Sequence, residues 1–101
     1  MSPEVTERLK TADIRVMSQG QYFCLFVRDG CVGMVPRTSD LNGLDRNGSS
    51  GLSLDEGLGY LVFREGTPIF VGQGFEVAAT EEQVEKVRQF TLDLQHALGF
   101  D

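Results

Sequence analysis

The chain has 101 residues, of which 41% are hydrophobic and 24% are charged, and its formal net charge is −6 at pH 7. This size and composition predict a single soluble domain spanning residues 1–101. The acidic balance argues against binding to nucleic acid or to an anionic membrane surface, because both are recognised through Lys and Arg. No stretch approaches the roughly 18 apolar residues of a membrane helix. Residues 1–13 lack the apolar core of a secretory signal, so we expect a cytoplasmic protein.

The N-terminal residues predict a short helix followed by a strand. Residues 2–4, Ser-Pro-Glu, combine a capping hydroxyl, a proline for the first turn and an acid for the positive end of the helix dipole. Val5, Leu9 and Ala12 follow at helical spacing. Residues 14–18 then alternate between apolar and polar side chains, which is typical of a half-buried strand.

Two similar stretches each predict a β-hairpin. They read LFVRDGCVGMV at residues 25–35 and LVFREGTPIFV at residues 61–71. In both, apolar arms surround an acidic residue followed by glycine, and Asp-Gly between β-formers is a strong hairpin signal. Shared structural demands explain the similarity better than duplication does, because the flanking residues show no further match.

The first hairpin contains both cysteines, Cys24 and Cys31. A two-residue turn at residues 29–30 puts them on one face but about 13 Å apart along the ribbon. A disulfide requires Cα atoms within about 7 Å, so we expect two free thiols and a reducing compartment. The same register sets Phe26 opposite Gly33, and we expect the ring to cover the glycine.

The C-terminal residues carry the clearest helix signals. Residues 80–83, Thr-Glu-Glu-Gln, form a capping box, and Gly99 is a fitting end. His96, the only histidine, suits the negative end of the helix dipole. Apolar and small side chains form a stripe at helical spacing, with Phe90 beside it. The members of this stripe are Val84, Val87, Thr91, Leu94 and Leu98.

Between the hairpins, residues 38–57 are rich in Gly, Ser, Asn and Asp, which predicts a long flexible loop. Within it, DRNGSSGLSLDE at residues 45–56 resembles an EF-hand calcium loop in its alternate oxygen-bearing side chains. The metal ligands that this resemblance implies are Asp45, Asn47, Ser49 and Glu56. Ser50 stands where the turn glycine is expected, and the flanking residues do not predict helices. The favoured interpretation is therefore a polar loop without metal.

The sequence predicts no catalytic residue and no cofactor. Catalysis of the Cys-His kind would need His96, and nothing in the sequence brings it to Cys24 or Cys31. Two cysteines without CxxC spacing do not make a structural zinc site. Gly72 and Gly74 do not match a phosphate-binding loop and are interpreted as a bulge or bend late in a strand.

Together these elements predict an α+β fold. We expect a short N-terminal helix, an antiparallel sheet of about five strands, and a long C-terminal helix packed on one face. The runs at residues 22–27 and 60–63 are apolar on successive positions, so both faces of the sheet need cover. Two helices are too few to cover both faces, and apolar surface that is left exposed usually marks a contact with a partner protein. The sequence thus predicts a homodimer through the second sheet face or through strand edges.

The preferred functional hypothesis is a small acidic non-enzymatic protein-interaction module, adaptor-like or chaperone-like. The predicted order of helix, three strands, linker, two strands and helix, with the negative charge, resembles the layout of the small acidic chaperones of type III secretion. That resemblance implies a dimer that wraps an extended segment of an effector protein. The alternative hypothesis is a metal- or small-ligand-binding sensor that uses loop 38–57. An enzyme is the third, with no residue set to assign.

Overall fold

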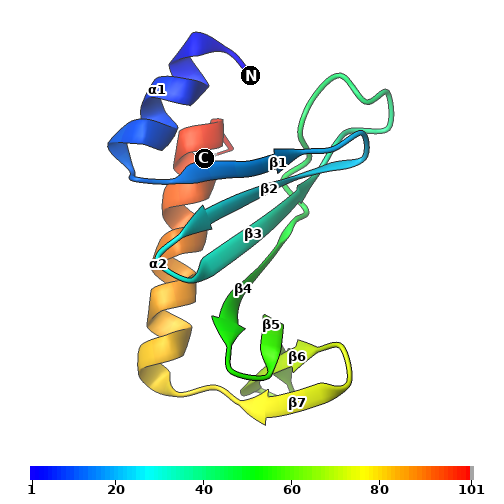
Figure 1. Cartoon of the computed structure of the whole chain (residues 1–101), viewed down its shortest axis with the longest axis vertical. Coiled ribbons are helices and arrows are strands. Elements are labelled where there is room, and N and C mark those ends of the chain that lie inside the picture. The colour runs from blue at the N-terminus through cyan, green and yellow to red at the C-terminus, as the bar shows by residue number, and fades with distance from the viewer. Residues whose placement is uncertain (101) are drawn as a thin grey trace.

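The computed structural model describes residues 1–100 and has an α+β architecture, with two helices and one seven-stranded antiparallel sheet (Figure 1). The strands form a meander in the order β1 to β7, so each strand pairs with its neighbours in the sequence. The elements are α1 (Pro3–Thr11), β1 (Arg15–Gln19), β2 (Phe23–Arg28), β3 (Cys31–Pro36), β4 (Ser49–Leu54), β5 (Gly57–Arg64), β6 (Thr67–Gly72), β7 (Phe75–Ala78) and α2 (Glu81–Leu98).

Both helices begin at the predicted caps. The Ser2 hydroxyl accepts a hydrogen bond from the Val5 N–H at 3.2 Å, ahead of the proline that opens α1. Thr80 and Gln83 form the reciprocal capping box of α2. Gly99 ends that helix in the left-handed conformation at φ 81°, which costs a glycine little. The structure therefore confirms both predicted helices.

The two hairpin predictions are confirmed, with tight two-residue turns. Asp29 and Gly30 have φ of 48° and 83°, and Glu65 and Gly66 have φ of 53° and 81°. Positive φ at both turn residues is the type I′ geometry, which matches the twist of the flanking strands.

The first hairpin has the predicted register, with Phe26 opposite Gly33. The expected cover of the glycine by the Phe26 ring is wrong, however. A Cβ at Gly33 would lie 2.7 Å from Leu94 Cδ2 and 3.1 Å from Phe90 Cε2, so α2 fills the space above the glycine. Gly33 therefore allows the helix to approach the sheet closely.

The prediction of five strands is wrong, because β4 and β7 were not expected. The predicted loop over residues 38–57 contains all six residues of β4, so the irregular segment between β3 and β4 covers residues 37–48 only. Gly74, at φ 84°, lies in the two-residue turn between β6 and β7 rather than in a bulge or bend within one strand. Gly72 ends β6 and pairs with Phe75 across that turn.

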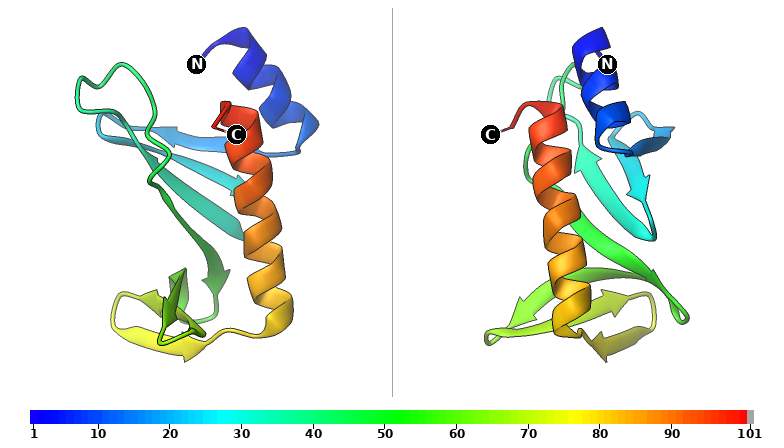
Figure 2. Two further views of the ribbon diagram at one scale, coloured as in Figure 1. Left: turned by 180° about the vertical axis from the view of Figure 1, so that it is seen from behind. Right: turned by 90° about the vertical axis from the view of Figure 1, so that its left-hand side faces the viewer.

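Helix α2 packs along one face of the sheet, and α1 packs against the C-terminal part of α2 (Figures 1 and 2). The Arg8 Nε–H donates to the Ala97 carbonyl at 2.9 Å and so joins the two helices. The core between helix and sheet is built from fully buried apolar side chains. Its largest members are Phe26, Phe70 and Phe90, with Val87, Cys24 and Cys31. Of the described residues, no helix is long and apolar enough to cross a membrane.

Candidate functional site

The structure does not bring the four predicted calcium ligands together. Asp45 and Asn47 lie in the segment before β4, and the Asn47 N–H donates to Asp45 Oδ1 at 2.9 Å. Ser49 begins β4, whereas Glu56 lies in the turn beyond its far end. A six-residue strand spans about 17 Å, so the closing carboxylate is too far away to share a cation. Among residues 1–100, no three His, Cys, Asp or Glu side chains are placed to hold a metal ion.

Side-chain oxygens at the start of the segment between β3 and β4 stabilise the turns of that same segment. The Thr38 hydroxyl donates to Asp40 Oδ1 at 2.6 Å, and the Asn42 N–H donates to the same oxygen at 3.0 Å. These hydrogen bonds, that of Thr38 first, lower the pKa of the Asp40 carboxyl below its ordinary value. The Gly43 N–H in turn donates to Thr38 Oγ1 at 3.1 Å. The lowered pKa thus reflects a local turn rather than a site that awaits a ligand.

The two cysteines are free, as predicted, and the structure shows that both are buried. Burial raises the pKa of the Cys31 thiol, and the nearby charges of Lys86 and Arg28 oppose this only in part. A reactive cysteine needs the opposite shift, because the thiolate is the nucleophile. Cys31 is therefore a core residue rather than a catalytic one.

Both thiols are expected to react with Ellman's reagent at least about a hundredfold more slowly in the native protein than in the urea-unfolded chain, because reaction requires local opening. Absorbance at 412 nm after mixing measures the rate, and Cys24→Ser and Cys31→Ser assign each phase. A native rate equal to the unfolded rate for either thiol contradicts its burial.

A polar cleft lies between the two helices, and its central group is Arg28. The Arg28 Nη1 donates to the Ala12 carbonyl at 3.0 Å and lies 2.9 Å from Asp93 Oδ2. Its guanidinium also lies 5.5 Å from the centre of the Phe90 ring. His96 lines this cleft, whereas neither cysteine does. Arg28 thus joins β2 to both helices, and the cleft does not assemble a Cys-His pair.

An apolar groove separates α2 from β5, and we call it the α2 groove. Its volume is about 340 Å³. Two side chains on its rim are largely exposed: Phe63 at 62% on β5 and Leu92 at 53% on α2. Leu61, Val84 and Val87 continue the apolar lining. The right-hand view of Figure 2 shows the β5–β6 hairpin projecting to one side of the N-terminal part of α2.

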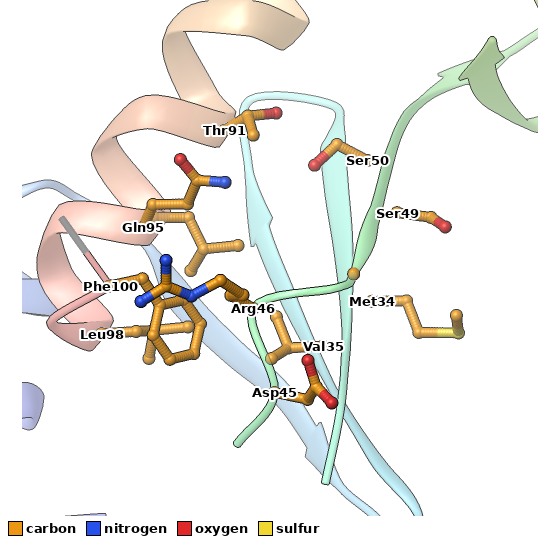
Figure 3. Close-up of a pocket in the computed structure, with 12 residues that line it drawn as sticks. Met34, Val35, Asp45, Arg46, Ser49, Ser50, Thr91, Gln95, Leu98 and Phe100 are labelled. Carbon is orange, nitrogen blue, oxygen red and sulfur yellow. The ribbon is translucent and has the colours of Figure 1, made fainter. Parts of the chain in front are cut away.

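The α2 groove continues along the helix into a smaller pocket of about 30 Å³ (Figure 3). Apolar side chains, among them Val35, Leu94 and Leu98, line this pocket beside the polar ones. Residues 48–50 and Thr91 line both hollows. The Arg46 side chain extends toward α2 in Figure 3, near Gln95, and Ser50 lies across from Thr91. Within residues 1–100, no hydrogen bond or ion pair engages the side chains of Arg46, Ser50 or Gln95. The groove therefore has a wider apolar end and a narrower end, here called the polar end, where the Arg46 guanidinium has no ion pair within residues 1–100.

The sheet face opposite α2, here called the outer face, carries apolar side chains from four strands. The register places them on alternate positions, away from the residues that contact the helix. They are Phe23, Leu25 and Val27 of β2, Val32 and Met34 of β3, Tyr60 and Val62 of β5, and Ile69 and Val71 of β6. Phe23 and Val62 are 41% and 39% exposed, whereas Val32 is buried, and Tyr60 and Val62 also line the α2 groove. No helix in the described part of the chain lies over this face (Figures 1 and 2).

The α2 groove could not be predicted from the sequence. Leu92 lies outside the predicted helix stripe, and Phe63 lies in a hairpin arm, two residues before the turn. An apolar residue on the polar side of an amphipathic helix is the signal that points to Leu92. No comparable signal in the sequence singles out Arg46, because its position depends on how the segment before β4 crosses α2.

No family model, curated protein or solved structure matches this chain. The resemblance to the layout of type III secretion chaperones depended on three strands, a linker and two strands. The structure has β4 where that linker was predicted and adds β7 before α2. The order of elements that suggested the resemblance is therefore absent from residues 1–100.

Proposed function

We propose that this chain is a non-enzymatic protein-interaction module, adaptor-like or chaperone-like, that acts as a homodimer. The observation that supports this best is the outer face, where apolar side chains from four strands have no helix above them. Exposed apolar surface of this kind usually marks a protein contact. A two-fold dimer would cover the same face on both copies.

The distribution of shifted pKa values also favours a binding role. Enzyme active sites gather groups with shifted pKa values in one cleft. Here the pKa of Asp40 is lowered by a turn, and the pKa of Glu76 is lowered by its hydrogen bonds and charge pairing with Arg64. The pKa of Cys31 in the core is raised by burial, and the pKa of Arg64 is raised by its hydrogen bonds with Glu76. Apart from the exposed Arg64–Glu76 pair, these groups lie far apart in the chain, and no two of the four line one pocket.

The cytoplasm is the compartment that we propose for this module. Its two cysteines are free and buried, which suits a reducing environment. The acidic charge suits solubility.

Sedimentation velocity at several concentrations tests the homodimer. We expect the wild-type chain to dimerise, and Phe23→Glu to raise the dimer dissociation constant at least about a hundredfold. Two carboxylates would then be brought together across the symmetric outer face, and like charges in an interface cost several kcal/mol. Phe63→Glu is the matched control, because it makes the same change at a more exposed residue of the α2 groove.

Two results contradict the proposed dimer. A wild-type chain that remains monomeric at every concentration removes the self-associating face. A dimer that is unaffected by Phe23→Glu but dissociates with Phe63→Glu would show that the interface lies outside the outer face.

A further inference from the structure

We propose that the α2 groove binds an extended segment of a partner protein in which two apolar side chains, two positions apart, lie close to a carboxylate that pairs with Arg46. This inference rests on the proposed role in protein interaction and assigns it a second surface, which shares only Tyr60 and Val62 of β5 with the outer face. The apolar side chains of the segment contact Phe63 and Leu92, and its carboxylate reaches the polar end of the groove.

The apolar end of the groove favours a polypeptide over a small molecule. Phe63 and Leu92 stand on opposite walls and are 62% and 53% exposed, so the apolar surface extends from the groove onto its rim. A small ligand inside the groove would leave these two side chains in water. A chain lying along the groove covers both of them and also fills the hollow beside Leu61 and Val87.

The polar end selects the charge of the occupant. Arg88, the cation at the apolar end, is already paired with Glu85, with its Nη2 at 2.7 Å from Oε2. Asp45 is a neighbour of Arg46 in the smaller pocket, and it accepts the Asn47 N–H at 2.9 Å. Arg46 has no ion pair within residues 1–100 and extends toward α2 (Figure 3). A guanidinium binds a carboxylate with two parallel hydrogen bonds, so an acid is the complementary group.

The length of the groove sets the size of the segment. From Val84 to Gln95, eleven steps along α2 span about 16 Å at 1.5 Å per residue. An extended peptide covers this length with about five residues at 3.3 Å each. Side chains two positions apart then point to the same side, into the groove. The acidic residue of the segment lies about two or three positions before or after this pair of apolar residues.

Selection of phage-displayed random 12-residue peptides on the immobilised full chain tests this inference. We expect wild type to enrich peptides with two apolar residues at alternate positions and an Asp or Glu nearby. Arg46→Glu should replace that acid by Lys or Arg in the enriched sequences. Phe63→Ser should weaken the best wild-type peptide at least tenfold. Arg15→Glu, the same charge change on an exposed residue of β1, is the matched control and should leave selection unchanged.

Binding of the best peptide should shift the backbone amide resonances of Leu61, Phe63 and Leu92 and leave those of the β2 residues of the outer face in place. Enrichment without an acid, or an unchanged preference in Arg46→Glu, overturns the charge assignment. Failure to enrich any peptide overturns the docking site, as does binding of dodecanoate in its place. In each case a dimer that persists in sedimentation leaves the proposed function standing. If Phe63→Ser and Arg46→Glu dissociate the dimer instead, the groove is filled by a second copy and the inference fails.

Discussion

Replacing Phe90 with alanine is expected to lower the free energy of unfolding by about 3–5 kcal/mol. Phe90 is fully buried in the middle of α2, and a Cβ at Gly33 would lie 3.1 Å from its ring. The Arg28 guanidinium lies 5.5 Å from the ring centre and adds a cation–π contact. The truncation therefore leaves a cavity between helix and sheet and removes one of the contacts that position Arg28.

Urea unfolding followed by circular dichroism measures this effect, at one fixed protein concentration because dimerisation would add to the apparent stability. Phe63→Ala is the matched control, since this ring is 62% exposed, and it is expected to cost less than about 1 kcal/mol. Equal losses in the two variants would contradict the placement of Phe90 at the centre of the core.

The elements that could be predicted from the sequence are those whose signals are local. The capping box at residues 80–83 satisfies backbone donors within one helical turn, and the turn at residues 29–30 needs only an acid and a glycine between apolar arms. These hydrogen bonds and dihedral angles depend on neighbours in the chain. The fold class, both helices and both predicted hairpins followed from them.

The two missed strands depend on partners that the chain supplies elsewhere. Strand β4, SSGLSL, has the composition of a loop and becomes a strand because it pairs with β3 on one side and β5 on the other. Its small residues fit where the paired backbones approach closely. Strand β7 has only four residues, and its pairing with β6 depends on the turn at residues 73–74.

The same strand removes the geometry of the calcium-loop pattern. Alternate oxygens converge on one cation only if the chain curls around it. Residues 49–54 are instead extended by pairing on both sides, so Asp45 and Glu56 lie beyond opposite ends of β4. The α2 groove was missed for a related reason, because its walls come from β5 and α2, whose separation is set by tertiary packing.

Gly51→Ala is expected to lower the free energy of unfolding by about 3 kcal/mol or more. Overpacking usually costs about 1–3 kcal/mol, and this site lies at or above the upper end of that range. A Cβ at Gly51 would lie within van der Waals overlap of the Gly59 carbonyl oxygen, and 2.9 Å from Tyr60 Cα. Both neighbours are backbone atoms of β5, and they cannot rotate away as a side chain can. Strands β4 and β5 would have to separate, although their pairing joins the two halves of the sheet.

Gly43→Ala is the matched control, measured by the same urea unfolding. A Cβ there would meet only the Thr38 side chain, at an ordinary 3.5 Å. Because alanine restricts the unfolded chain, this variant should be neutral or up to about 1 kcal/mol more stable. The two Gly→Ala changes thus have opposite expected signs, which distinguishes the effect of the backbone contact from a general effect of losing glycine.

Gly51→Ala should also weaken peptide binding, since β5 carries one wall of the α2 groove. A Gly51→Ala protein as stable as wild type would contradict the close approach of β4 and β5.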